Sequence, residues 1–163
     1  MDQEICIDCR KPKVDSTCGI CGEGVCRKCR NFLAEEEFPL ELVRPENLMH
    51  SYYCGGCNEQ IVEPFRTDYN AALEQAKEIN VIYRDSKSSF RILRKSKKLL
   101  QAGNLPDRDE AILRIAFQAA REGFNAILDV EVSSQKKREA GRQVSIWAAQ
   151  GYPAAIHSHE LDR

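Results

Sequence analysis

The stretch Cys18-Gly-Ile-Cys-Gly-Glu-Gly-Val-Cys-Arg-Lys-Cys29 holds two C-x-x-C pairs that are separated by only four residues. Two more such pairs lie on either side of it, so all eight cysteines of the chain fall within the first 57 residues. Two residues between thiols suit a tight turn that directs both sulfurs at one tetrahedral ion, and each pair is therefore half of a Cys₄ zinc site. The sequence predicts two zinc ions per chain, held by four pairs: Cys6/Cys9, Cys18/Cys21, Cys26/Cys29 and Cys54/Cys57.

Other uses of eight cysteines fit this pattern less well. A disulfide framework needs an oxidising compartment and usually has irregular spacing. A thioredoxin-like redox motif needs one C-x-x-C in a βαβ context, and iron–sulfur proteins usually carry C-x₂-C-x₂-C runs. His50, four residues before Cys54, is a candidate substitute ligand that we interpret as an exposed loop residue. Four thiolates leave no position open for water or substrate, so we expect structural sites.

The gaps between the pairs are eight, four and twenty-four residues long. This spacing allows sequential pairing (first with second, third with fourth) and interleaved pairing (first with third, second with fourth). The segment 18–29 resembles the centre of FYVE and related FYVE/PHD-type zinc fingers, which carry C-x-x-C-G-x-x-x-C-x-x-C there. RING fingers are near relatives, but they usually include a His ligand. The resemblance spans about residues 4–62 and implies a cross-brace, treble-clef finger. It implies one ion on Cys6, Cys9, Cys26 and Cys29 and another on Cys18, Cys21, Cys54 and Cys57.

The composition of the whole chain excludes some classes of protein. Its 163 residues carry 24 Lys plus Arg against 25 Asp plus Glu, a formal net charge of −1. This balance argues against a protein that coats nucleic acid through its phosphates, and no apolar run approaches the roughly 20 residues of a transmembrane segment. The first 25 residues are charged and have no apolar h-region, so nothing resembles a signal peptide. We expect a cytoplasmic location, where thiols stay reduced.

Helical patterns begin beyond the last cysteine. We expect a short helix over 54–63 that ends at Pro64, followed by an amphipathic helix over 68–79 with Thr67 as its N-cap. A third helix is predicted over 107–122. An Asp cap at 107 with Glu three residues later marks its start, and Gly123 marks its end.

Strand patterns surround the third helix. Residues 80–84 can form a short strand, with a second apolar stretch at 90–93. Apolar and polar residues alternate over 128–133 and 144–149, which predicts a β-hairpin around a polar turn from 135 to 141. We expect an α+β protein in which a small C-terminal domain packs a helix on an antiparallel sheet. The expected domains are a two-zinc finger (1–62), a linking helix (63–79), the α+β domain (80–157) and a tail (158–163).

The C-terminal domain resembles the small α+β domain of the YbjQ type, a family named for heavy-metal binding. The matching residues are Ala119-Ala-Arg-Glu-Gly-Phe-Asn-Ala-Ile127 and Gly151-Tyr-Pro-Ala-Ala155. That family commonly has Gly-Thr-Ala-Val where this chain has Gly151-Tyr-Pro-Ala, and the strand after Asn125 carries acidic residues. The resemblance implies a domain that tends to oligomerise, so a second copy of this chain is one candidate partner.

Several polar groups of the C-terminal half have a functional and a plain interpretation. Asp129 and Glu131 are candidate metal ligands or paired carboxylates, although charges that alternate along a hairpin usually form its solvated side. His157 with His159 and Glu160 is a second candidate metal group, and a frayed tail is the plain alternative. Two basic clusters could attract an acidic partner or simply form solvated surface: residues 91–98, and Lys136, Lys137, Arg138 and Arg142.

We therefore expect a zinc-binding protein without enzymatic activity that contacts an unidentified partner protein or acts as a scaffold. The chain has no nucleophile elbow, Walker A loop, H-E-x-x-H motif or dinucleotide fingerprint. The alternatives are metal handling by the C-terminal domain and nucleic-acid binding through the finger and the basic run 91–98. FYVE domains that recognise phosphatidylinositol 3-phosphate place an Arg/His cluster before the third Cys. Val14-Asp-Ser-Thr17 stands there, with only Lys11 and Lys13 nearby, so we expect no specific binding of that lipid.

Overall fold

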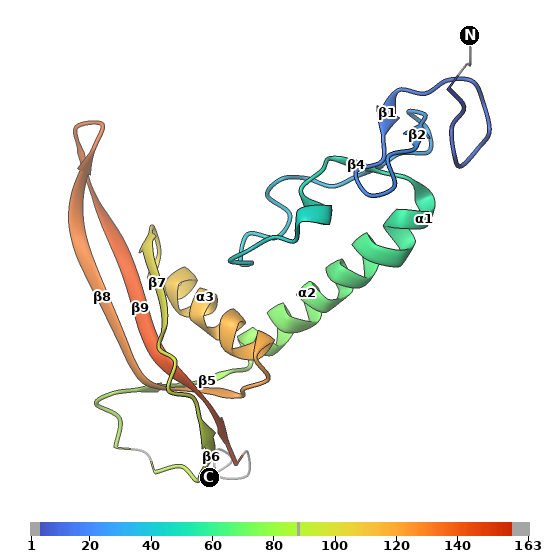
Figure 1. Ribbon diagram of the computed structural model, residues 1–163. Coiled ribbons are helices and arrows are strands. Elements are labelled where there is room, and N and C mark those ends of the chain that lie inside the picture. The colour runs from blue at the N-terminus through green and yellow to red at the C-terminus, as the bar shows by residue number, and fades with distance from the viewer. Residues whose placement is uncertain (1–3, 88, 158–163) are drawn as a thin grey trace. The chain divides into compact units, whose positions relative to one another are not determined.

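The computed structural model describes residues 4–87 and 89–157, and the chain divides after Asn70 into two compact units. Figure 1 shows the helices and strands of both units. Unit 1 is rich in cysteine and has short hairpins, whereas unit 2 packs a helix on a sheet. The predicted α+β class is confirmed.

Unit 1 contains two minimal antiparallel hairpins and a 3₁₀ turn at Glu46–Leu48. Strand β1 (Ser16–Thr17) pairs with β2 (Gly24–Val25), and β3 (Asn31–Phe32) pairs with β4 (Tyr52–Tyr53). Strands of two residues carry few backbone hydrogen bonds, and the fully buried side chains are few: among the largest are Val25, Leu33, Leu48, Tyr53 and Val62. A core this small needs additional support from a ligand or covalent link.

A helical run of 23 residues begins inside the last cysteine pair, with Cys54 at its N-cap. It consists of α1 (Gly55–Cys57), a π-helical turn (Asn58–Val62) and α2 (Glu63–Lys77). The predicted end at Pro64 and the predicted cap at Thr67 are therefore wrong, because both residues lie inside α2. Proline clashes with the carbonyl one turn earlier in a regular α-helix. Here the Glu63 N–H bonds the carbonyl five residues before it, and this wider turn accommodates the Pro64 ring.

The loop between β3 and β4 packs on the first turns of α2 through aromatic rings. Phe38 lies edge-on to Phe65 with ring centroids 4.9 Å apart, and its centroid is 5.1 Å from that of Tyr69. The Tyr69 hydroxyl accepts a hydrogen bond of 3.4 Å from the Leu40 amide. These contacts bury Phe38, Leu40 and Tyr69 within unit 1.

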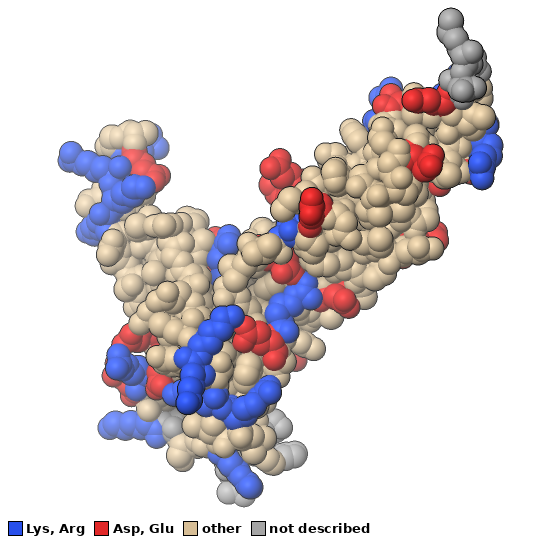
Figure 2. Space-filling view, in the orientation of Figure 1, with Lys and Arg blue, Asp and Glu red and all other residues tan. Residues whose placement is uncertain are grey.

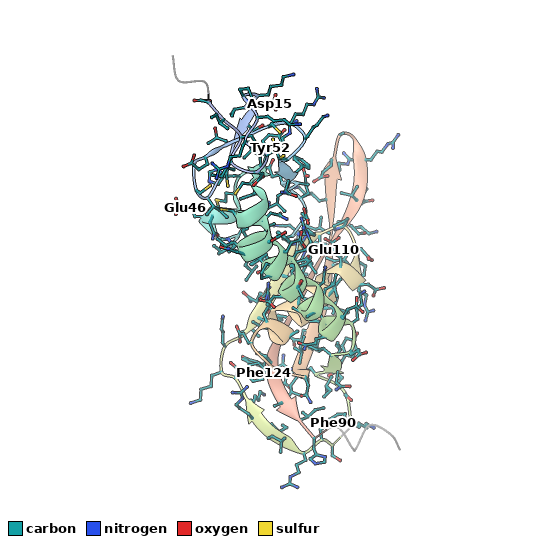
Figure 3. All side chains as sticks on the ribbon, turned by 90° about the vertical axis from the view of Figure 1, so that its right-hand side faces the viewer. Asp15, Glu46, Tyr52, Phe90, Glu110 and Phe124 are labelled. Carbon is teal, nitrogen blue, oxygen red and sulfur yellow. The ribbon has the colours of Figure 1, made fainter. Side chains whose placement is uncertain are left out.

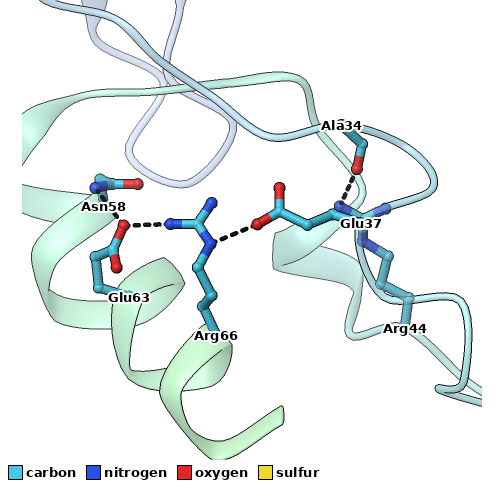
Figure 4. Close-up of polar contacts among 6 residues, drawn as sticks. All are labelled: Ala34, Glu37, Arg44, Asn58, Glu63 and Arg66. Atoms are coloured by element: carbon cyan, nitrogen blue, oxygen red, sulfur yellow. Dashed lines mark hydrogen bonds and ion pairs between the residues drawn. The ribbon is translucent and has the colours of Figure 1, made fainter. Parts of the chain in front are cut away.

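Two arginines hold the same loop in place (Figure 4). Arg66 on α2 forms ion pairs with Glu63 on its own helix and with Glu37 in the loop. Arg44 donates to the carbonyl of Ala34 at 3.2 Å, which ties one end of the loop to the other. The loop is thus a packed part of unit 1.

Unit 2 is built on a five-stranded sheet in the order β5-β8-β9-β6, with β7 also paired to β9. The strands are β5 (Asn80–Tyr83), β6 (Ile92–Lys95), β7 (Leu100–Leu105), β8 (Ala126–Glu139) and β9 (Arg142–Ile156). All pairs are antiparallel except that of β5 with β8. The predicted hairpin is present, but β8 continues to Glu139 where a loop from 135 to 141 was expected.

Helix α3 (Arg108–Arg121) confirms the predicted third helix. Asp107 occupies the N-cap position, but its side chain makes no capping hydrogen bond, and Glu110 pairs with Arg114 at 3.0 Å. The expected capping box is therefore absent. At the other end the amide of Phe124 bonds the Ala119 carbonyl and that of Gly123 bonds the Ala120 carbonyl, both at 3.0 Å. Gly123 has φ +80°, as a Schellman C-terminus requires.

The sheet buries apolar residues on both faces near α3. Helix α3 contacts β7, β8 and β9 and contributes a buried row that includes Ala111, Ile115 and Ala119. A second cluster consists of Ala126, Leu128, Ala154 and Ile156, with Ile82 and Phe90 packed against it. The Asn125 side chain bonds both the N–H and the carbonyl of Ile156, at 2.8 and 2.9 Å, and so fixes the end of β9.

Candidate metal centres

The eight thiols of unit 1 form two groups of four, drawn among the sulfur atoms in yellow in Figure 3. One group contains Cys6, Cys9, Cys26 and Cys29, and the other contains Cys18, Cys21, Cys54 and Cys57. Within each group the sulfur atoms all lie within 4.8 Å of one another. The structure therefore joins the first pair to the third and the second to the fourth, the interleaved order of a cross-brace.

The distances between pairs fit a tetrahedral thiolate shell. The Sγ atoms of Cys9 and Cys26 are 3.7 Å apart, and those of Cys21 and Cys54 are 3.9 Å apart. A tetrahedron with Zn–S bonds of about 2.3 Å has S–S edges of about 3.8 Å. Each group can thus hold one metal ion, and its soft donors and spacing suit Zn²⁺. Four protein ligands fill the coordination shell of such an ion.

Each cysteine pair sits in the same kind of turn. The carbonyl of the first cysteine accepts a hydrogen bond from the amide four residues later. The bonds are Arg10 to Cys6 at 2.9 Å, Gly22 to Cys18 at 3.0 Å, Arg30 to Cys26 at 3.0 Å and Asn58 to Cys54 at 2.9 Å. The first two turns close through left-handed residues, Arg10 with φ +62° and Gly22 with φ +76°. The same backbone turn thus positions the two sulfurs within each pair.

Backbone amides also point at the sulfurs. The Cys26 N–H donates to Sγ of Cys6 at 3.3 Å, and the Cys57 N–H donates to Sγ of Cys54 at 3.4 Å. Hydrogen bonds from the backbone of Cys9 and Cys26 lower the pKa of Cys6 to about 6, which favours its thiolate. The neighbouring thiols of Cys26 and Cys9 raise the pKa of Cys29 to about 12. A divalent cation offsets this mutual repulsion and lets all four sulfurs ionise.

A side-chain hydrogen bond connects the two groups. The Asp8 carboxylate, inside the first cysteine pair, accepts a hydrogen bond of 3.0 Å from the Gly55 amide, inside the last pair. No spacing rule pointed to Asp8 in the sequence, because a single acidic residue in a turn has no characteristic pattern. The link holds the turn of one group against the turn of the other.

His50 lies outside both sulfur groups. Its side chain packs on Gly19, where a Cβ would be only 2.3 Å from the His50 Cβ. The Tyr53 hydroxyl donates to the His50 carbonyl at 3.0 Å. His50 is an exposed residue that closes the loop before β4.

The segment before the third cysteine carries one acidic residue, Asp15, and its charge is paired. Asp15 forms an ion pair with Arg30, whose guanidinium lies 4.3 Å from the centre of the Tyr52 ring. Figure 3 labels Asp15 and Tyr52 in this part of unit 1. Arg30 thus already has an acidic partner within unit 1. The absence of specific lipid recognition stays a prediction.

The candidate carboxylates of unit 2 also have cationic partners. Asp129, at a bulge with φ +53°, pairs with Lys95 at 2.8 Å. Glu131 pairs with Arg84, which lowers the pKa of the Glu131 carboxyl, and accepts a hydrogen bond of 2.7 Å from Gln150. In the described parts of the chain, only the two cysteine groups bring three or more metal-binding side chains together. His159 and Glu160 lie outside the described residues.

The basic run 91–98 carries less free charge than its composition indicates. Lys95 pairs with Asp129, and Lys98 pairs with Glu122 at 3.0 Å. The Arg94 guanidinium lies 4.5 Å from the centre of the Phe124 ring. These contacts tie the run to unit 2 itself.

A hollow of about 920 Å³ in unit 2 is lined by side chains that bond one another. Gln101 donates to Gln150 at 3.3 Å, Gln150 donates to Glu131, and Glu131 pairs with Arg84. The chain of contacts crosses from β7 through β9 and β8 to the end of β5. We interpret it as a structural network that links the strands.

No protein-family model, curated protein or solved structure matches this chain. The resemblances to FYVE/PHD-type fingers and to YbjQ-type domains therefore remain resemblances in short motifs. Within the described residues, no helix has the length and apolar character needed to cross a membrane.

Proposed function

We propose that the protein is a zinc-binding interaction module without enzymatic activity, in which two zinc ions hold unit 1 in shape for contact with a partner protein. The observation that carries this proposal is the pair of four-thiol groups with edges of 3.7 and 3.9 Å between cysteine pairs. Filled shells of this kind serve structure, because they leave no site for a substrate.

Support for the interaction role comes from large apolar side chains that unit 1 leaves exposed. Phe32 is 62% exposed, Leu42 72%, Val43 80% and Met49 63%. All four belong to β3 or to the segment between β3 and β4, which is otherwise packed on α2. Contiguous exposed apolar patches mark protein contact sites, and these four side chains are the candidates for such a patch in unit 1.

The test combines zinc content with cross-linking from one exposed position. A photo-reactive amino acid at Val43 should cross-link the zinc-loaded chain to a defined protein in its native host. The same group at exposed Glu46 serves as a positional control and should not produce that product. X-ray absorption should show two zinc ions per chain with only sulfur neighbours.

Two matched single-residue variants link zinc content to the cross-linking result. Cys9→Ser should lose the zinc of its own group and weaken the cross-link, since the loop loses its support. His50→Gln removes another metal-capable side chain and should retain both ions. One zinc per chain, or nitrogen and oxygen in its shell, would contradict the ligand assignment. An unchanged cross-link in Cys9→Ser that has lost the zinc of this group would separate the interaction from that metal site.

A further inference from the structure

The β8–β9 hairpin extends as a two-stranded ribbon whose far half is exposed. Its register runs without interruption from Glu131 opposite Gln150 to Glu139 opposite Arg142. Ala140 and Gly141 form the turn with φ of +47° and +78°, the signs of a type I′ turn that suits the twist of a hairpin. The strand residues 133–139 are all exposed, whereas strands in sheets usually bury one face. Protein packing therefore does not explain why the ribbon is so long.

The tip of the ribbon, residues 135–143, is strongly cationic in a chain of net charge −1. It carries Lys136, Lys137, Arg138 and Arg142 against one acid, Glu139. Glu139 pairs with Lys137 at 3.2 Å. Among the residues that the structure describes, no carboxylate pairs with the other three cations. Figure 2 shows these Lys and Arg side chains gathered at the tip, at the upper left of the view.

The cations are divided between the two faces of the ribbon. Strand alternation and pairing place Lys136 and Arg138 on the face of Ser145 and Gln143. Lys137 and Arg142 lie on the opposite face with Glu139. The first face carries no acid from Ser134 to the turn and offers hydroxyl and amide groups beside its two cations.

This arrangement matches one class of acidic macromolecule. The major groove of B-form DNA is about 12 Å wide and admits a two-stranded β-ribbon, with a phosphate backbone on each side. Cations on both faces of a ribbon can reach both backbones, while Gln135 and Gln143 are hydrogen-bonding groups near the turn. A membrane surface would require apolar side chains at the tip, but Ala140 is the only apolar residue from 135 to 143.

We propose that the tip of the β8–β9 ribbon binds duplex DNA, with the ribbon in the major groove and its cations on the flanking phosphates. The site is independent of the two cysteine groups and of the proposed role of unit 1. It also differs from the basic run 91–98, where Lys95 and Lys98 already have acidic partners.

The test measures binding of the full zinc-loaded chain to a labelled 20-base-pair duplex by fluorescence anisotropy at several salt concentrations. Three unpaired cations predict a log–log salt slope of about −3, so affinity should fall about 60-fold from 50 to 200 mM salt. Lys136→Gln/Arg138→Gln should weaken binding at least about tenfold and make the slope shallower by about 2. Glu139→Gln removes the only acid and should tighten binding several-fold.

Two double variants remove the same charge elsewhere. Lys11→Gln/Lys13→Gln in unit 1 and Lys97→Gln/Lys98→Gln in the basic run should each leave affinity within about twofold, because neither alters the ribbon. All substituted positions are exposed, and circular dichroism should show unchanged folding. Equal loss of affinity in a control variant, or none in the ribbon variant, would overturn the proposal.

Competitors distinguish duplex DNA from other polyanions. Duplex RNA of the same sequence has a major groove that is too narrow for the ribbon and should compete at least about tenfold more weakly. Single-stranded DNA, polyglutamate and anionic vesicles should be weaker still. If any of them competes as well as duplex DNA, the ribbon is a general anion-binding surface and the groove assignment is wrong.

Discussion

Gly151 shows how the absence of a side chain allows β8 and β9 to approach each other closely. A Cβ at this position would lie 2.5 Å from Cγ2 of Ile127 and 3.2 Å from the Leu128 carbonyl oxygen. Both neighbours belong to the buried part of β8, next to the bulge at Asp129. Alternation predicted the strand only over 144–149, and the close approach at Gly151 depends on the bulge, so it could not be predicted from the sequence.

Gly151→Ala should lower the free energy of unfolding of unit 2 by about 1–3 kcal/mol, because the core must shift to admit the methyl group. Gly103→Ala on β7 is the matched control. A Cβ there would be 3.8 Å from the Ala148 Cβ, an ordinary contact, so stability should be unchanged or slightly higher. Urea unfolding of the zinc-loaded chains measures both. Equal stability of Gly151→Ala and the wild type would show that β9 adjusts freely at this point.

Among the elements, helices and strands were predicted correctly where one of their faces is buried and the opposite face is exposed to solvent. Helix α3 and residues 128–133 of β8 have such faces, and their periodicity could be recognised in the sequence. The outer half of β8 is exposed on both faces, so residues 135–139 carry no alternation and resembled a loop. Strand β7 was not predicted because Gly103 and Asn104, the latter with φ +57°, interrupt its pattern.

The turn of the hairpin is an element that the sequence does not optimise. Ala140 adopts φ +47°, a region that Asn and Gly occupy at lower cost than Ala. Ala140→Asn creates the Asn-Gly pair that type I′ turns prefer, and should raise the free energy of unfolding by about 0.5–1 kcal/mol. Ser134→Asn introduces the same side chain in mid-strand and should bring no gain. A destabilised Ala140→Asn variant would mean that the turn has another geometry in solution.

The two units of the molecule are stabilised in different ways. Unit 1 has a small core and two thiol groups, whereas unit 2 has a continuous apolar core between α3 and its sheet. The existence and spacing of the thiol groups followed from the cysteine pattern alone. Their interleaved pairing did not, because spacing left two arrangements open and only the resemblance favoured this one.

Removal of metal should therefore act on one unit. A strong chelator should abolish amide protection in residues 4–62, because their fold depends on metal binding, which is worth about 10–16 kcal/mol per structural site. Protection in α3, β8 and β9 should persist. Hydrogen exchange with mass spectrometry reports both regions, and added zinc should restore the first. Loss of protection in α3 on chelation would show that the units unfold together.

The interleaved pairing also determines the order in which the two thiol groups are completed during protein synthesis. A ribosome releases the chain from its N-terminus, and the four thiols of the first group are complete once Cys29 has emerged. The second group has only Cys18 and Cys21 at that stage, and both lie within the loop that the first group closes. Its remaining ligands, Cys54 and Cys57, arrive with the start of the long helix. The four thiols of the second group are therefore complete only when the first turn of that helix has emerged, so the second of the two proposed ions can be held by all four ligands only from that stage on.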